Sequence, residues 1–196
     1  MSGLPGGHAA GGLVAGAVRS PSPSGPDPYS GPMDSASRDR LAGLLTAPGQ
    51  PLGVRESAAL ELAEAGDRRA FETLALLLNY RHQALAGRAA TALLRLGDPR
   101  TARTAAALAT NPLRVGYALP AIRLLVALRA PEAVPALAET LQRLAGQPRL
   151  AHEPVAAACV EGLTALCGAA PPPAARRALA AASAHPRLIA PRTPTP

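Results

Sequence analysis

The chain contains no lysine and no tryptophan, and it has only one phenylalanine and three tyrosines among 196 residues. Because large aromatic side chains are so scarce, any core must be built from alanine and leucine packed at close approach. All twenty basic residues are arginines. Arg, Ala, Gly and Pro share GC-rich codons, so we interpret this bias as the mark of a GC-rich bacterial genome rather than of selection for arginine chemistry.

Cysteine and long hydrophobic runs are scarce as well. The two cysteines, Cys159 and Cys167, are eight residues apart on one expected helix, a rise of roughly 12 Å that exceeds the reach of a disulfide. No apolar run is long enough to span a membrane, and the mildly apolar stretch 11–18 is short, glycine-rich and not preceded by basic residues. We therefore expect a cytoplasmic protein with no membrane association.

Proline and glycine, 22 and 18 residues, are concentrated at the two ends and in short turns. Segments with this composition and few large apolar groups cannot form a core. The sequence therefore predicts a disordered Gly/Ser/Pro-rich tail over residues 1–34, a folded domain over 35–185 and a disordered proline-rich tail over 186–196.

The folded part carries one apolar pattern four times. Each copy has internal spacings of 4, 4 and 3 residues, typical of one face of an α-helix, and the copies are offset by 31, 32 and 38 residues. The four copies are Val54, Ala58, Leu62, Ala65; Leu85, Ala89, Leu93, Leu96; Tyr117, Ala121, Leu125, Leu128; and Val155, Cys159, Leu163, Leu166. A period of this size indicates stacked helix pairs, because one pair alone cannot bury its apolar face.

Turns and partner helices repeat in the same register. Gly66 and Gly97 occupy the expected left-handed ends of two striped helices, Asp67 and Asp98 follow as N-caps, and Pro99 is expected at a first helical position. Pro120 predicts that the third striped helix is kinked or begins late, near Leu119. The aligned positions on the partner helices are Leu74, Ala105, Leu137 and Ala175, and then Leu78, Ala109, Leu141 and Leu179.

Three segments, VRESAALELAEAGD at 54–67, LGDPR at 96–100 and PEAVPAL at 131–137, resemble HEAT repeats, particularly the short bacterial HEAT-like type. The resemblance implies an all-α, armadillo-type fold: a right-handed α-solenoid of about four antiparallel helix pairs plus a capping helix. It also implies a scaffold that binds proteins, with the second helix of each pair lining the concave surface.

Positive charge is concentrated in the central repeats, where residues 81–131 contain eight arginines and one acidic residue, Asp98. Three of these arginines are seven residues apart, on one helical face away from the apolar stripe, and two more come from the next unit. We expect this set to bind an acidic protein segment, with a merely solvated helix face as the alternative. The candidate partner-binding residues are Arg81, Arg88, Arg95, Arg114 and Arg123.

Two other functions remain open at this stage. HEAT-like alkylpurine DNA glycosylases bind DNA in such an array with aromatic residues and an acidic catalytic group, whereas these repeats have almost no aromatic residues. Nucleic-acid binding through the arginine face is therefore the second hypothesis. A role resembling that of HEAT-like bilin lyase subunits is the third. The loop at 146–154 is a further place where binding specificity could lie.

We expect no catalytic residue, metal or cofactor. His152-Glu153 resembles the His-Glu pairs with which HEAT-like deoxyhypusine hydroxylases bind two irons, but its nearest companion is His82-Gln83, where an amide replaces the carboxylate. Cys159 occupies a stripe position that holds alanine in the other copies, which favours a buried core residue over a nucleophile or ligand.

Overall fold

The computed structural model describes residues 33–185, and this part of the chain contains helices and no β-strand. The all-α prediction is therefore confirmed for these residues, whereas the tails predicted at either end lie outside them except for Met33 and Asp34. No helix in the described range is long and apolar enough to cross a bilayer. The α-helices are α1 (Ser35–Thr46), α2 (Leu52–Glu64), α3 (Phe71–Leu78), α4 (Gln83–Leu96), α5 (Thr101–Thr110), α6 (Leu119–Leu128), α7 (Ala133–Gly146), α8 (Glu153–Cys167) and α9 (Pro173–Ser183). Three short 3-10 helices are η1 (Arg68–Ala70), η2 (Pro112–Tyr117) and η3 (Leu150–His152).

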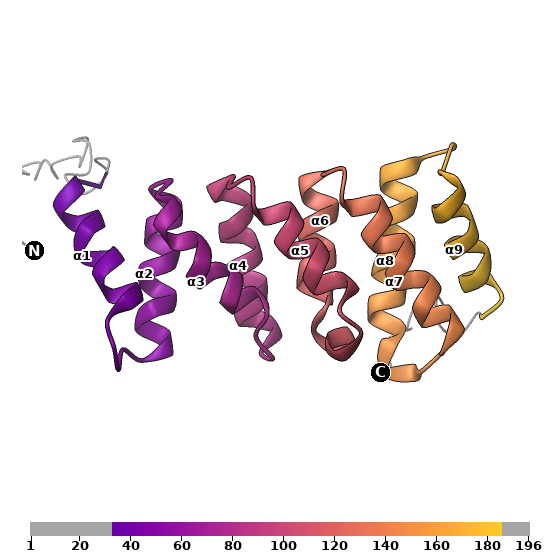
Figure 1. Cartoon of the computed structure of the whole chain (residues 1–196), viewed down its shortest axis with the longest axis horizontal. Helices are drawn as coiled ribbons and strands as arrows, with labels where there is room; N and C mark the ends of the chain where they lie inside the picture. The colour runs from indigo at the N-terminus through magenta and orange to yellow at the C-terminus, as the bar shows by residue number, and fades with distance from the viewer. Residues whose placement is uncertain (1–32, 186–196) are drawn as a thin grey trace, which may run out of the picture. The chain divides into compact units, whose positions relative to one another are not determined.

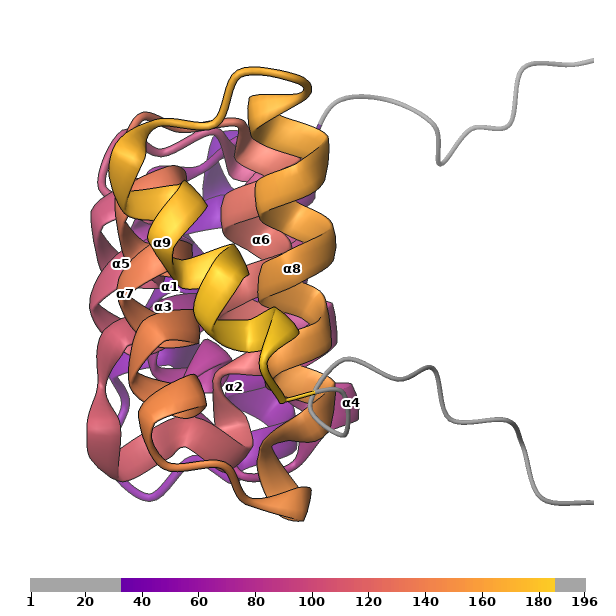
Figure 2. The ribbon, with the colours of Figure 1, turned by 90° about the vertical axis from the view of Figure 1, so that its right-hand side faces the viewer.

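The helices of residues 33–185 form two layers. Helices α1, α3, α5 and α7 lie in the first layer, and each packs against the helix that follows it in the chain, α2, α4, α6 or α8, in the second layer (Figures 1 and 2). Within the second layer each helix also contacts the next, from α2 to α8. Helix α9 packs mainly on α7, so the row of pairs ends on a single helix.

The repeated apolar positions form the core of this arrangement. The third residue of every stripe copy is fully buried, and so is the first aligned residue of every partner helix. Leucine and alanine fill these positions because helices built from them pack closely without aromatic side chains. The four stripe residues are Leu62, Leu93, Leu125 and Leu163, and the four partner residues are Leu74, Ala105, Leu137 and Ala175.

Two members of the stripe depart from the prediction. Val54 is 38% exposed, because α2 is the first helix of the second layer and no earlier described helix covers that side. Tyr117 lies in η2 instead of the third striped helix, which begins at Leu119 with Pro120 in its first turn. The late start expected from Pro120 is confirmed, since proline lacks an N–H and is tolerated only where a helix begins.

The turns between units reuse one backbone conformation. Gly66 and Gly97 have φ angles of 70° and 62°, as expected for helix ends, and the equivalent position in the third copy is Arg129, with a φ of 50°. Asp67 and Asp98 each accept a hydrogen bond from the backbone N–H two residues further on, at 3.0 Å and 2.9 Å. Pro99 is expected at a first helical position, but α5 begins two residues later, at Thr101, and Pro99 lies in the turn before it.

Candidate binding surfaces

The five candidate arginines occupy three different environments. Arg81 and Arg123 are exposed and make no hydrogen bond or ion pair within residues 33–185. Arg88 and Arg95 are also exposed, but each pairs with a glutamate of α2. Arg114 is half-buried. The structure therefore does not present the five side chains as one uniform row of free cations.

The ion pairs of α4 connect neighbouring units. Arg88 Nε donates to Glu56 Oε1 at 2.7 Å, and Arg95 Nη1 lies 3.4 Å from Glu64 Oε1. The Glu56 side chain is only 13% exposed and that of Arg88 53%, whereas both partners of the second pair are more than 60% exposed. The first pair is consequently the better formed. Sequence reasoning missed both, although their offsets of 32 and 31 residues match the spacing of 31 between the first two copies to within one residue.

Arg114 completes the end of another helix. Its guanidinium donates to the backbone carbonyl of Asn79, the residue that caps the C-terminus of α3, and lies over the ring of Tyr117 at 5.1 Å from the centroid. A cation at a helix C-terminus is stabilised by the exposed carbonyls there. Arg114 is thus engaged within the fold.

A groove of about 320 Å³ separates α4 from α6 on the second layer. Its sides are mainly apolar, and they include Leu94, which is 40% exposed, and Leu119. Arg123 lines the same groove as its one charged residue. A second groove, between α2 and α4, contains Arg88, Arg95 and Glu64. The two grooves share Thr91, so α4 forms the ridge between them.

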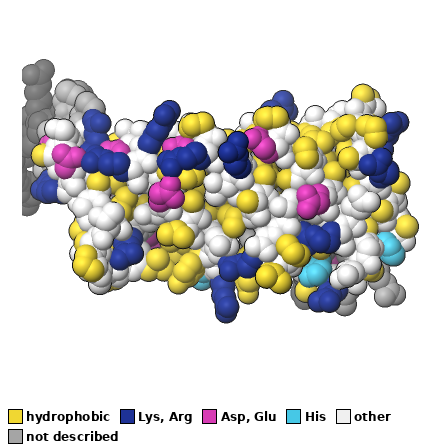
Figure 3. Space-filling view, viewed as in Figure 1, with side chains coloured by type: hydrophobic (Ala, Val, Ile, Leu, Met, Phe, Trp, Pro, Cys, Tyr) yellow, Lys and Arg dark blue, Asp and Glu magenta, His cyan; other side chains and the backbone are white. Residues whose placement is uncertain are grey.

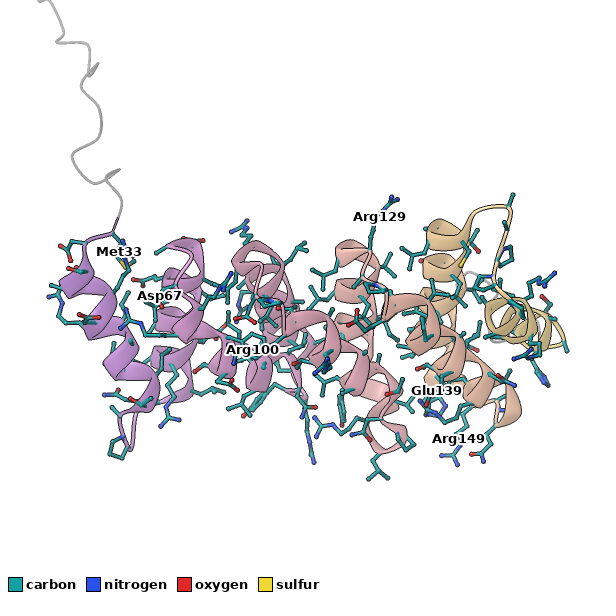
Figure 4. The ribbon with its side chains drawn as sticks, turned by 45° about the horizontal axis from the view of Figure 1, so that its top comes forward. Met33, Asp67, Arg100, Arg129, Glu139 and Arg149 are labelled. Carbon is teal, nitrogen blue, oxygen red and sulfur yellow. The ribbon has the colours of Figure 1, made fainter. Side chains whose placement is uncertain are left out.

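A further charge cluster occupies the turn that precedes α5. Arg100 donates from Nε and Nη2 to the buried carboxylate of Asp98, each at 3.0 Å, and from Nη1 to Glu72 at 2.7 Å. These hydrogen bonds hold the pKa of Asp98 below its ordinary value. Arg100 also lies 3.9 Å from the centroid of the Phe71 ring. Figure 4 labels Arg100 and, separately, Asp67 of the preceding turn. Figure 3 shows acidic and basic side chains gathered over this part of the first layer.

The preceding turn repeats the same arrangement. Arg69 donates to Asp67 and reaches back to Asp39 of α1 at 2.7 Å. In the next turn along the chain the position equivalent to Arg100 holds Glu132, and no ion pair forms there within the described residues. Each of the two clusters thus connects its turn to the preceding unit through one acidic partner, Asp39 or Glu72.

Cys159 and the His/Cys/Asp/Glu side chains are the candidates for catalysis or metal binding. Burial raises the pKa of the Cys159 thiol to about 12, which makes it a poor nucleophile at neutral pH. The prediction that Cys159 is a buried core residue is confirmed. Within residues 33–185, no group of three or more His, Cys, Asp or Glu side chains is arranged to hold a metal ion.

Comparison with known protein families, characterised proteins and solved structures finds no match to this chain. The candidate surfaces therefore have to be interpreted from their own geometry and charge.

Proposed function

We propose that this chain is a HEAT-like α-solenoid that acts as a non-enzymatic protein-interaction module. Its ligand is an acidic, partly apolar segment of a partner protein, bound on the second helix layer across α4. The observation that carries this proposal is the groove between α4 and α6, which combines exposed apolar surface with an unpaired arginine, Arg123.

The apolar sides of the groove supply the affinity in this proposal. Leu94 is a large aliphatic side chain that remains 40% exposed near the C-terminal end of α4, although α4 packs against its neighbours. Covering such a side chain with an apolar residue of the partner is favourable by about 25 cal/mol per Å² of buried apolar surface. A groove of this kind accommodates the apolar face of a helix or an extended peptide.

The arginines supply charge complementarity. Arg123 and Arg81 have no acidic partner within residues 33–185, so each can bind a carboxylate without breaking an existing contact. Arg95 holds Glu64 only at 3.4 Å, with both side chains largely exposed, and a partner carboxylate can compete for it. Arg88 is less available because Glu56 is mostly buried beneath it.

The test compares partner capture by the wild-type protein and a double variant, Leu94→Gln with Arg123→Gln. A matched control carries the same changes on the first layer, Leu76→Gln with Arg103→Gln, because Leu76 is also exposed and Arg103 forms no hydrogen bond or ion pair within residues 33–185. We expect the groove variant to lose the partner that the wild type and the control both retain. Loss of the partner in both variants, or in neither, would contradict the proposal.

A salt series on the same proteins separates this function from nucleic-acid binding. Phosphate contacts make the logarithm of the affinity fall linearly and steeply with the logarithm of salt concentration, regardless of sequence. For an acidic segment seated in an apolar groove, we expect a shallower dependence, because the apolar contacts persist when charge is screened. A steep slope with DNA or RNA oligonucleotides would favour the nucleic-acid hypothesis instead.

A further inference from the structure

A second pocket, distinct from the groove of the proposed function, lies where η2, the end of α7 and η3 meet. It has a volume of about 420 Å³, and three of its lining residues are basic or titratable: Arg143, Arg149 and His152. No aspartate or glutamate lines it. We call this site the basic pocket. Figure 4 labels Arg149, which lies between the end of α7 and η3.

Two of its polar atoms have unused hydrogen-bonding capacity. Arg143 Nε and His152 Nδ1 are buried and have no hydrogen-bond partner. Buried polar atoms without partners are rare in folded proteins, because each loses its bonds to water and gains none in exchange. Once the two side chains turn towards the pocket, a bound group that accepts hydrogen bonds would satisfy Arg143 Nε, and also His152 Nδ1 in the tautomer that carries its proton there.

The fold holds one of these donors in place. Arg143 Nη2 donates to the carbonyl of Thr110 at the end of α5, at 3.2 Å, which fixes the plane of the guanidinium. The backbone N–H of His152 donates to the carbonyl of Arg149 at 2.9 Å, which closes the turn that carries both side chains. The pocket therefore has preorganised parts as well as charge.

One edge of the basic pocket is apolar. Leu113 of η2 is 88% exposed, the largest exposure among the large hydrophobic side chains of the described residues, and Pro112 beside it also lines the pocket. An apolar edge next to a set of cationic donors suits a ligand that has an anionic head and an organic body.

We propose that the basic pocket binds the phosphate group of an organic phosphomonoester, with Leu113 against the organic part. Two permanent cations and a histidine around one pocket match a dianion with three acceptor oxygens better than a carboxylate, which one arginine can satisfy in a bidentate contact. This site and its ligand go beyond the proposed function and do not depend on it.

The experiment measures binding of phenyl phosphate to the full chain by isothermal titration calorimetry. Benzoate has the same ring with a carboxylate head, and inorganic phosphate has the head without the ring. We expect phenyl phosphate to bind most tightly, inorganic phosphate more weakly and benzoate most weakly. Benzoate binding as tightly as phenyl phosphate would show a general anion site and overturn the assignment to phosphate.

The variants test whether binding occurs in the basic pocket. Arg149→Gln removes an exposed cation whose side chain forms no hydrogen bond or ion pair within residues 33–185, and we expect it to weaken phenyl phosphate binding by about tenfold. Leu113→Ser should weaken phenyl phosphate but leave inorganic phosphate unchanged. The matched control is Arg176→Gln, an exposed arginine of α9, which should bind like the wild type.

Arg143→Gln is avoided as the primary variant because Arg143 also holds the end of α5. No measurable phenyl phosphate binding by the wild type, or an equal loss in Arg149→Gln and Arg176→Gln, would overturn the proposal. Equal losses would mean that the ligand responds to net charge rather than to this pocket.

Discussion

Arg88 of α4 binds Glu56 of α2, a residue 32 positions earlier in the chain and one repeat earlier in the structure. Arg95 and Glu64 repeat the relationship at an offset of 31. In each pair the acidic residue belongs to the earlier unit and the arginine to the later one. The positive charge of the central repeats is therefore partly balanced by the preceding unit, and the surface is less basic there than the local composition indicates.

The Arg88–Glu56 pair should contribute a small but measurable coupling energy. A double-mutant cycle with Arg88→Ala and Glu56→Ala, followed by urea unfolding, is expected to give a coupling of about 0.5–1 kcal/mol, because Arg88 remains half exposed and the pair is screened by solvent. The coupling should decrease as salt is added. The corresponding cycle for Arg95 and Glu64, a longer and more exposed pair, should give a value near zero. Equal couplings in the two cycles would contradict this ranking.

The fold was largely predictable because it depends on periodic positions. Leu93 and Leu125 are buried where the stripe predicts, and Gly97 has the expected left-handed conformation. The ion pairs were predictable in principle, since charges one period apart face each other across stacked helices. The basic pocket was not, because it depends on how η2 bends the chain at Arg114, whose φ of −125° no periodic pattern indicates.

At Gly162, helix α8 lies close against side chains of both α6 and α7. A Cβ added there would lie 2.5 Å from Val126 Cγ2 and 2.6 Å from Leu137 Cδ2. We expect Gly162→Ala to lower the free energy of unfolding by about 1–3 kcal/mol, because overpacking against a stiff β-branched side chain outweighs the better helix propensity of alanine. Thermal or urea unfolding measures the change.

Gly43→Ala is the matched control for Gly162→Ala. Gly43 also lies inside a helix, α1, but it is exposed and an added Cβ would meet nothing within 4 Å. This substitution should stabilise the protein by roughly 0.5–1 kcal/mol. Stabilisation by both substitutions would show that α6, α7 and α8 can separate without loss.

Arg129 carries backbone strain at the third turn. Its φ of 50° is in the left-handed region, where the equivalent positions hold Gly66 and Gly97. Arg129→Gly should raise the free energy of unfolding by about 0.5–1 kcal/mol, after allowance for the greater freedom of glycine in the unfolded chain. Gly97→Ala should shift the melting temperature in the opposite direction. A lower melting temperature for Arg129→Gly would indicate that its side chain makes a compensating contact.

His152 should give the protein a pH-dependent stability. Burial, followed by the charges of Arg149 and Arg143, lowers the pKa of His152 below its ordinary value of 6.5. The folded state then binds fewer protons than the unfolded state, so stability is fully present above pH 6.5 and declines as the pH falls through the lower folded-state value. The residue that follows His152 in the chain, Glu153, is acidic. His152→Gln should flatten this part of the stability profile.

An NMR titration of the His152 ring measures this effect directly. Arg149→Gln should raise the pKa of His152 towards its ordinary value, because one of the two facing cations is removed. Arg176→Gln, far along the chain on α9, should leave it unchanged. No shift with Arg149→Gln would mean that burial and Arg143 set the pKa of His152 without a contribution from Arg149.

The guanidinium groups that hold the carbonyls of Asn79 and Thr110 come from Arg114 and Arg143, each more than thirty residues later in the chain. The pairs α3–α4 and α5–α6 are therefore not self-contained. In each, a carbonyl at the C-terminus of the first helix accepts its hydrogen bond from an arginine of the following pair. If the array were shortened at its C-terminal side or an extra copy were inserted, a carbonyl at a helix C-terminus would lose its hydrogen-bond donor unless the next copy carried that arginine. Lengthening or recombining this protein thus requires that the copy placed after α3 or α5 carry an arginine equivalent to Arg114 or Arg143.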